Sequence, residues 1–256
     1  MSPQRYMRDF VLRTIFCADM LAMKPRPWTV QKHGEIEQLE ANLWRVEGTV
    51  PGIPMKRVMT IAKLADGGLV IHSAVALDDV EMAKLDALGP VKFIVVPNGY
   101  HRLDGGAYAT RYPQARVLAP RGSKKRVAQV VPNVGELSEL SDFDVTLTTV
   151  AGTRNVEALM IVKSGNKTSL VFTDTVFNMP HKHGLPGFVL KHITQSSGGP
   201  KVSRLARLFI IKDKPAFAAQ LDELAATQPV RVLVAHHETI TDDPAGCLRR
   251  IAASVR

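Results

Sequence analysis

Short apolar runs separated by turn-forming residues dominate the chain from residue 36 onward. Asp66-Gly67-Gly68 favours a hairpin turn, and Asp78 with Glu81 is typical of a capping box at a helix start. Apart from Lys92, residues 91–97 are apolar, as in a strand buried on both faces. The first half therefore predicts strands at 42–48, 57–64, 68–75, 91–97 and 115–120, with helices at 78–88, 104–112 and after Arg121.

The second half repeats this plan, with hairpin strands first and helices alternating with strands afterwards. It predicts strands at 144–150, 156–163, 168–174 and 230–237, and helices at 202–211, 215–227 and from 242 onward. The repetition favours an α/β (α+β) protein in which two sheets pack face to face with helices outside, a four-layer αββα sandwich. Because no long Gly/Ser linker divides it, residues 32–256 are expected to form a single domain.

Residues 1–31 differ from the rest and are interpreted as an N-terminal extension. Arg13 interrupts their apolar run, which argues against a secretory signal. The segment is either an amphipathic helix that packs on the body or, in part, an extension of the gene model, with Met7, Met20 and Met23 as alternative starts. We expect it to be dispensable for the core fold.

Composition narrows the class of protein. The 256 residues are 45% hydrophobic and 22% charged, which excludes a disordered chain and a coiled coil. No stretch of about 18 uncharged apolar residues occurs, so no membrane span is predicted. The two cysteines, Cys17 and Cys247, are too few for a disulfide framework and favour a reducing, cytoplasmic setting.

The chain is basic, with 33 Lys+Arg against 24 Asp+Glu and a net charge of +9. Such a charge can attract nucleic acid or an anionic small molecule. The tightest basic cluster, residues 121–126, is interpreted as a solvated helix start, so nucleic acid is disfavoured as a partner. A small-molecule substrate or ligand is expected, and a homo-oligomer is compatible with the sequence.

Polar side chains lie at, or shortly after, the carboxyl ends of three of the predicted strands. They are Asn98, His101, Asp104, Asp174, His236 and His237. In α/β architectures ligands gather at the carboxyl ends of buried strands. Of the adjacent pair His236 and His237, only one can face such a site, because neighbouring strand residues point to opposite faces.

Four segments carry a resemblance to a known family: RVMTIAKLADGGLVIHSAVAL, IVVPNGYHRLDGG, LVFTDTVFN and LVAHHE. With the order of elements, they resemble the metallo-β-lactamase fold superfamily, the αββα sandwich of zinc hydrolases, and are more similar to an uncharacterised, divergent branch of it. The resemblance covers residues 36–256. It implies a metal-dependent hydrolase.

The superfamily signature H-x-H-x-D-H is missing. Its four ligand positions fall on Asn98, Tyr100, Arg102 and Leu103. By resemblance, Asp174 takes the bridging aspartate position and His236 the final histidine position, while His101 and Glu157 match loosely. These four residues imply an altered site that holds one divalent ion, with Zn²⁺ preferred over Mn²⁺ or Fe²⁺, or that holds no ion.

The remaining candidates are alternative or supporting residues: Asn98, Asp104, His237, His181 and His183. Asp104 is interpreted as a helix N-cap, and the His181-Lys182-His183 segment as a mobile loop over the site. His72 and Ser73 are interpreted as structural. The function expected is hydrolysis of an ester, amide or phosphoester. The alternative is a catalytically silent member of the fold that binds a small molecule or partner.

Overall fold

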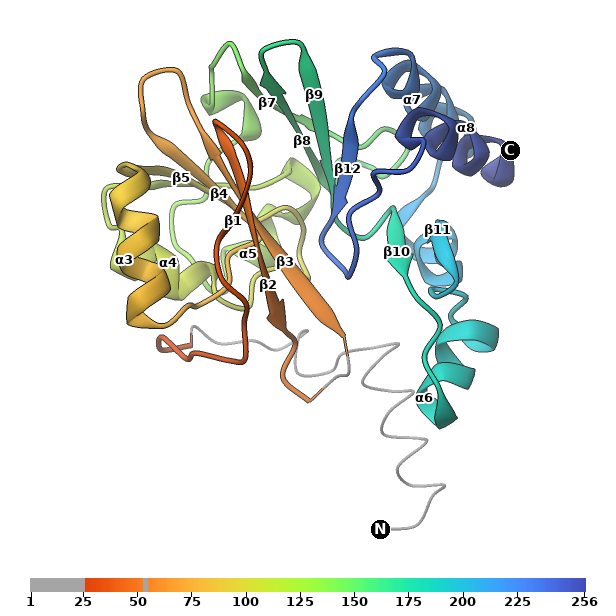
Figure 1. The fold of residues 1–256 in the computed structure, drawn as a ribbon, viewed down its shortest axis with the longest axis horizontal. Coiled ribbons are helices and arrows are strands. Elements are labelled where there is room, and N and C mark those ends of the chain that lie inside the picture. Colours follow the sequence, from red (N-terminus) through yellow and green to blue (C-terminus); the bar gives the residue numbers. More distant parts are fainter. Residues whose placement is uncertain (1–25, 53–54) are drawn as a thin grey trace.

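Two mixed β-sheets form the centre of the molecule (Figure 1). The structure is a computed structural model that describes residues 26–52 and 55–256. The six strands of the first sheet follow chain order: β1 (Glu37–Glu40), β2 (Leu43–Thr49), β3 (Lys56–Lys63), β4 (Leu69–His72), β5 (Val91–Val95) and β6 (Arg116–Leu118). Pairing is antiparallel from β1 to β4 and parallel from β4 to β6.

The second sheet has four strands, in the order β12 (Arg231–Val234), β9 (Lys167–Phe172), β8 (Ala158–Ser164) and β7 (Val145–Thr149). β12 runs parallel to β9, and the other two pairs are antiparallel. A separate ribbon pairs β10 (Phe177–Met179) with β11 (Gly199–Lys201). The hairpins predicted within 57–75 and 144–174 are thus confirmed, one in each large sheet.

Alternation of side chains along the strands divides the core into three layers. In β4, Val70 belongs to the apolar cluster that also holds Val171 of β9 and Leu233 of β12, so this cluster lies between the sheets. Ile71, on the opposite face of β4, packs in a second cluster with the helices of the first sheet. Phe172 of β9 packs in a third cluster with the helices of the second sheet.

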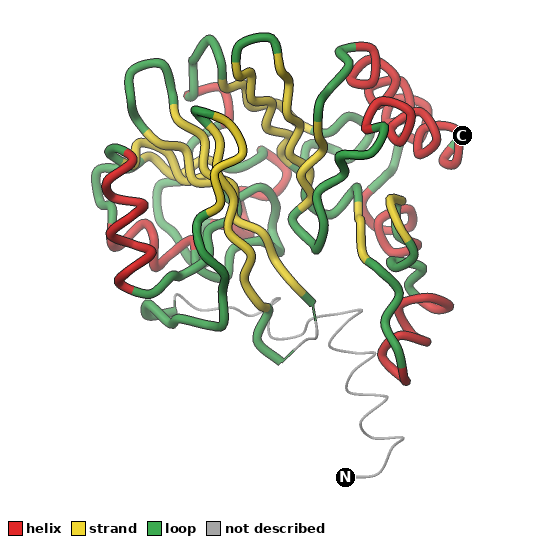
Figure 2. Tube along the Cα trace, in the orientation of Figure 1, coloured by secondary structure: helices red, strands yellow, loops and turns green. Residues whose placement is uncertain are grey.

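Helices cover the outer faces of both sheets (Figure 2). α3 (Asp79–Leu88) and α4 (Gly105–Arg111) pack on the first sheet, and α7 (Lys214–Ala226) and α8 (Pro244–Val255) on the second. Helices outside two facing sheets make the predicted four-layer αββα arrangement, which is confirmed.

The start of α3 departs in part from its prediction. Asp78 caps the helix, accepting a hydrogen bond from the Glu81 amide at 2.9 Å. The Glu81 carboxylate does not return to Asp78, as a full capping box requires. It accepts instead from the Ile36 amide at 2.7 Å and pairs with Lys84 at 2.6 Å. Glu81 therefore ties the chain before β1 to α3.

Several short elements differ from the predicted ones. The helix expected after Arg121 consists of η1 (Arg121–Ser123) and α5 (Lys124–Val127), followed by η2 (Leu137–Glu139). The segment between β10 and β11 holds α6 (Gly184–Phe188) and a π-helical turn, η3 (Val189–Ile193). The helix predicted at 202–211 is largely another π-helical turn, η4 (Ala206–Ile210). Elements of three to five residues are too short for an apolar period to specify.

The predicted N-terminal extension falls mainly outside the described residues. Within its described part, 26–31, Trp28 packs against α4. The Trp28 ring lies 5.0 Å from that of Tyr108, and its Nε1 donates to the Leu77 carbonyl at 3.0 Å. Trp28 is thus attached to the first sheet's outer layer.

Candidate metal centre

Three strand ends bring their polar side chains to one place. His101 follows β5 of the first sheet, whereas Asp174 and His236 follow the parallel strands β9 and β12 of the second. Two backbone hydrogen bonds join the sheets here. The Val58 amide donates to the Ala235 carbonyl, and the Ala158 amide to the Pro97 carbonyl, each at 2.8 Å. The strand ends are therefore held at a fixed separation.

The three side chains meet at the Asp174 carboxylate. Its Oδ1 lies 3.1 Å from His101 Nε2 and 3.2 Å from His236 Nε2. One potential ligand atom from each residue lies within 4.8 Å of the other two, so the group could hold a metal ion. The side chains are only 7%, 13% and 7% exposed for His101, Asp174 and His236. The convergence expected from the strand ends is confirmed for these three residues.

The orientation of the His236 ring is fixed from behind. Its Nδ1 lies 2.9 Å from the Lys56 carbonyl oxygen, which can only accept, so Nδ1 is the donor. Phe177 of β10 stacks on the ring at 5.4 Å with an interplanar angle of 12°. In the neutral ring, Nε2 then presents a lone pair to the Asp174 carboxylate.

The His101 ring is held in a similar way. Its Nδ1 lies 2.9 Å from the hydroxyl oxygen of Ser73. Ser73 follows β4 and has a φ of 59°, in the left-handed region that favours glycine. The backbone at the end of β4 therefore takes an uncommon conformation where its hydroxyl supports the ring. The interpretation of Ser73 as merely structural misses this contact.

Charge at the site favours an ionised Asp174. Burial opposes the charged form, but the electrostatic attraction of His101 and the contacts of both imidazole rings with the carboxylate outweigh it. Together they hold the pKa of Asp174 well below its ordinary value. The carboxylate is thus available as an anionic ligand.

Asn98 is a positioning residue for this carboxylate. Its Nδ2 donates to Asp174 Oδ2 at 2.8 Å, and its Oδ1 accepts from the amides of Tyr100 and His101 at 2.8 and 3.0 Å. The side chain is 3% exposed. Asn98 therefore links the loop that carries His101 to the second oxygen of Asp174.

Glu157 lies behind Asp174 and is not one of the group of three. It is fully buried, and its Oε1 accepts from the Thr173 amide and from the amide and hydroxyl of Thr175. Burial, followed by repulsion from Asp174, raises the pKa of Glu157 to about 7. Its contacts fix the two residues that flank Asp174. Among the described residues, its Oε2 has no hydrogen-bond partner.

His237 and Asp104 are engaged elsewhere. His237 has a φ of 71°, and its Nε2 accepts from the Lys56 amide at 3.5 Å. Asp104 stands at the N-cap position of α4, but its side chain makes no capping hydrogen bond. It forms a buried ion pair with Arg57 instead and accepts from the Ala76 amide at 3.0 Å. The expected capping role of Asp104 is therefore wrong.

His181 and His183 both lie outside the group of three. The His181 Nδ1 is 3.1 Å from the Ser197 hydroxyl, and both histidines are exposed. They lie between β10 and α6, in the segment that was interpreted as a loop over the site.

Sequence comparison gives no family. No family model matches the chain, and no curated protein matches it either. Among the described residues, no helix is long and apolar enough to cross a bilayer.

Structural comparison is informative. The chain is similar to the crystal structure of a metallo-beta-lactamase from Erythrobacter litoralis with beta-mercaptoethanol in its active site. The TM-score is 0.57 and the identity 13%, and the match covers 88% of this chain and 100% of the other. At that identity the likeness concerns the fold. Two mixed sheets, helices on both outer faces and this structural match agree: the chain has the metallo-beta-lactamase fold.

Proposed function

We propose that the protein is a metal-dependent hydrolase that binds one divalent ion, with zinc preferred, through His101, Asp174 and His236. The observation that carries the proposal is the direction of the His236 ring. With its Nδ1 proton donated to the Lys56 carbonyl, the Nε2 lone pair of the neutral ring faces a carboxylate oxygen at 3.2 Å. Two such atoms repel each other unless a proton or a cation lies between them.

The donor set fits a first-row ion. Two imidazoles and one carboxylate form a protein ligand set found in catalytic zinc sites, which keep a further position open. Such an ion supplies a Lewis acid and lowers the pKa of the water it binds to near neutrality. Hydrolysis of an ester, amide or phosphoester is the reaction class that this chemistry serves.

The chain's own residues support the centre by orienting its ligands. Asn98 fixes Asp174, Ser73 fixes the ring of His101, and the Lys56 carbonyl fixes that of His236. Partners of this kind set ring tautomer and ligand basicity. Phe177 covers one face of His236 and limits the access of water to that ring.

Two of the four ligand positions of the superfamily signature, Asn98 and Arg102, have other uses here. Arg102 is fully buried, and its guanidinium donates to the Arg126 carbonyl at 2.6 Å and to the side chain of Gln129. Asn98 holds Asp174. This supports a site for one ion. It is also the observation that favours the second candidate, a silent member of the fold that binds a ligand without hydrolysis.

Metal content tests the proposal. Untagged protein, purified without chelators or metal resins, is expected to contain or take up one equivalent of zinc, measured by elemental analysis and calorimetry. Asp174→Asn and His236→Ala are expected to lose that equivalent. His237→Ala changes the adjacent histidine and is the matched control, expected to retain it. Protein that stays empty and refuses both Zn²⁺ and Mn²⁺ would overturn the proposal.

Activity separates the two candidates. The metal-loaded protein is assayed on chromogenic esters, anilides and phosphodiesters. Two results together support the hydrolase: turnover that Asp174→Asn abolishes, and turnover that added metal restores to metal-free wild type. Stoichiometric metal without turnover of any class favours the silent binding protein.

A further inference from the structure

The positive charge of the chain is concentrated in one segment. Residues 175–212 contain six of the 33 Lys+Arg and none of the 24 Asp+Glu, so they carry +6 of the net charge of +9. They form β10, α6, η3, β11 and η4, which lie below α8 in Figure 1. Charge of one sign gathered in this way raises the local concentration of anions.

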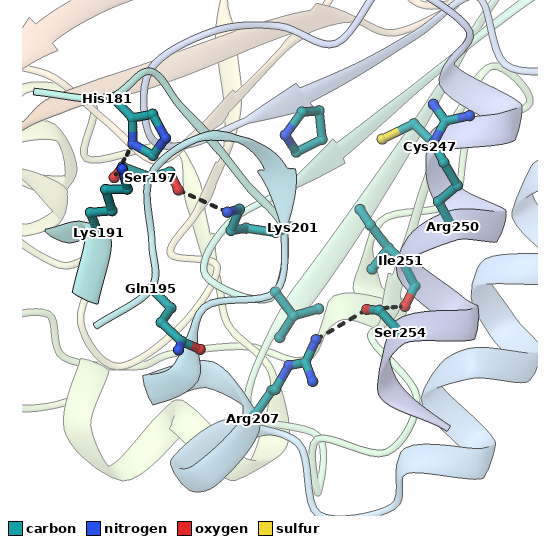
Figure 3. Close-up of a pocket in the computed structure, with 12 residues that line it drawn as sticks. His181, Lys191, Gln195, Ser197, Lys201, Arg207, Cys247, Arg250, Ile251 and Ser254 are labelled. Atoms are coloured by element: carbon teal, nitrogen blue, oxygen red, sulfur yellow. Dashed lines mark hydrogen bonds between the residues drawn. The ribbon is translucent and has the colours of Figure 1, made fainter. Parts of the chain in front are cut away.

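A cavity of about 590 Å³ opens between this segment and α8 (Figure 3). Four cations line it, each from a different element: Lys191 of η3, Lys201 of β11, Arg207 of η4 and Arg250 of α8. The volume lies within the range of sites for small organic ligands.

Three of the four cations are not neutralised by the protein. Arg250 pairs with Asp243 at 2.9 Å, but Lys191, Lys201 and Arg207 have no carboxylate within ion-pair distance anywhere in the described chain. Lys201 donates to the Ser197 carbonyl at 2.8 Å and Arg207 to the Ser254 hydroxyl at 3.1 Å. These neutral partners position the two side chains and leave their charges available.

The cavity also has an apolar wall. Val202 and Ile251 are each 3% exposed and contribute to its lining, with Cys247 beside them. A ligand that complements both parts has a group of two or more negative charges and an apolar body. A single carboxylate would leave at least two of the three available cations unmatched.

From these contacts we infer that the cavity binds a small organic phosphate, with the phosphate dianion in the basic part of the lining that Lys191, Lys201 and Arg207 supply and the organic part against Val202 and Ile251. Its residues are separate from the candidate metal ligands, and the inference stands without the proposed metal centre. The basic residues at 121–126 are a poorer anion site, because Glu136 lies 3.0 Å from Lys124 and 3.8 Å from Arg121.

Binding is measured by calorimetry at low ionic strength with EDTA present, so that a metal-centre contribution is removed. The probes are inorganic phosphate, AMP and 1-naphthyl phosphate, with adenosine and 1-naphthol as their phosphate-free counterparts. We expect both organic phosphates to bind saturably, more tightly than inorganic phosphate and than their counterparts. Binding should weaken as salt is added.

Two double variants with the same change in net charge separate the cavity from the overall charge. K201Q/R207Q removes two lining cations and should weaken organic phosphate binding at least ~10-fold, because charge-assisted hydrogen bonds are lost. K125Q/R249Q removes two exposed cations that do not line the cavity and is the matched control. It should leave the affinity nearly unchanged.

Three results would overturn the inference. They are no saturable binding of either organic phosphate up to about 10 mM, an equal loss in both double variants, and binding to phosphatidylserine vesicles without binding to the soluble phosphates. The last would assign the basic segment to a membrane surface, for which its exposed Phe188, Leu208 and Phe209 would provide apolar contacts.

Discussion

His72 should make the folded protein sensitive to mild acid. It is the last residue of β4, is 1% exposed, and its Nε2 has no hydrogen-bond partner among the described residues. Burial, followed by repulsion from His101, lowers the pKa of His72 from 6.5 to about 3. The folded state therefore holds a neutral ring over a pH range in which the unfolded chain holds a charged one.

The sign and size of the effect follow from linkage. Because the folded pKa is lower than the unfolded one, the His72 contribution to stability is fully present above pH 6.5 and is lost as the pH falls towards 3. Each pH unit in that window removes about 1.4 kcal/mol from the free energy of unfolding. At pH 5 the loss attributable to His72 is about 2 kcal/mol.

Urea unfolding at pH 7.5 and pH 5.0, with EDTA present, measures this loss in the wild type and in His72→Gln. The wild type should lose about 2 kcal/mol more than the variant between the two pH values. His183→Gln replaces an exposed histidine and should behave as the wild type. If wild type and His72→Gln lose the same free energy within about 0.5 kcal/mol, His72 is not held neutral by burial.

Three further predictions concern the fold and the site. Arg57→Leu leaves the buried Asp104 carboxylate without its cation and should lower the unfolding free energy by about 3–5 kcal/mol. The double variant R57L/D104L should recover part of that free energy, and a loss equal to the sum of the two single variants' losses would contradict this. In Gly152→Ala, the new Cβ would clash with the Asp213 carbonyl oxygen at a φ of 74°, so the melting temperature of this variant should fall well below that of Gly165→Ala, where nothing lies within 4 Å. Ser73→Ala should weaken zinc binding by about 10–100-fold in a competition assay with a chelating dye; an unchanged affinity would remove its positioning role.

The sheets were predictable from the sequence because their strands are mainly apolar runs bounded by strong turn signals. Residues 91–97 and 230–235 illustrate this, with one charged residue in each, and the polar residues that follow them, His101 and His236 among these, made the strand ends recognisable as a site. Hydrophobic burial determined this part of the fold.

Other parts depend on contacts that leave no local pattern. The Lys56 carbonyl that orients His236 is a backbone group, which any residue could provide. Glu157 lies near the start of a predicted strand, a position typical of an exposed carboxylate. It is nevertheless fully buried and accepts hydrogen bonds from Thr173 and Thr175. The elements between β10 and α7 are only three to five residues long, and Gly and Pro interrupt them.

The backbone bonds that join the two sheets beside the strand ends have a consequence for folding. His101 and Asp174 are 73 residues apart in the chain and come from different sheets. Bringing them together closes a long loop, whose entropic cost is met only when both sheets have formed and docked. A partly folded chain in which only one sheet has formed positions the candidate ligands of that sheet alone. The cluster is thus a chemical marker of the fully assembled molecule, and an ion that needs all its ligands would bind after folding and would not guide it.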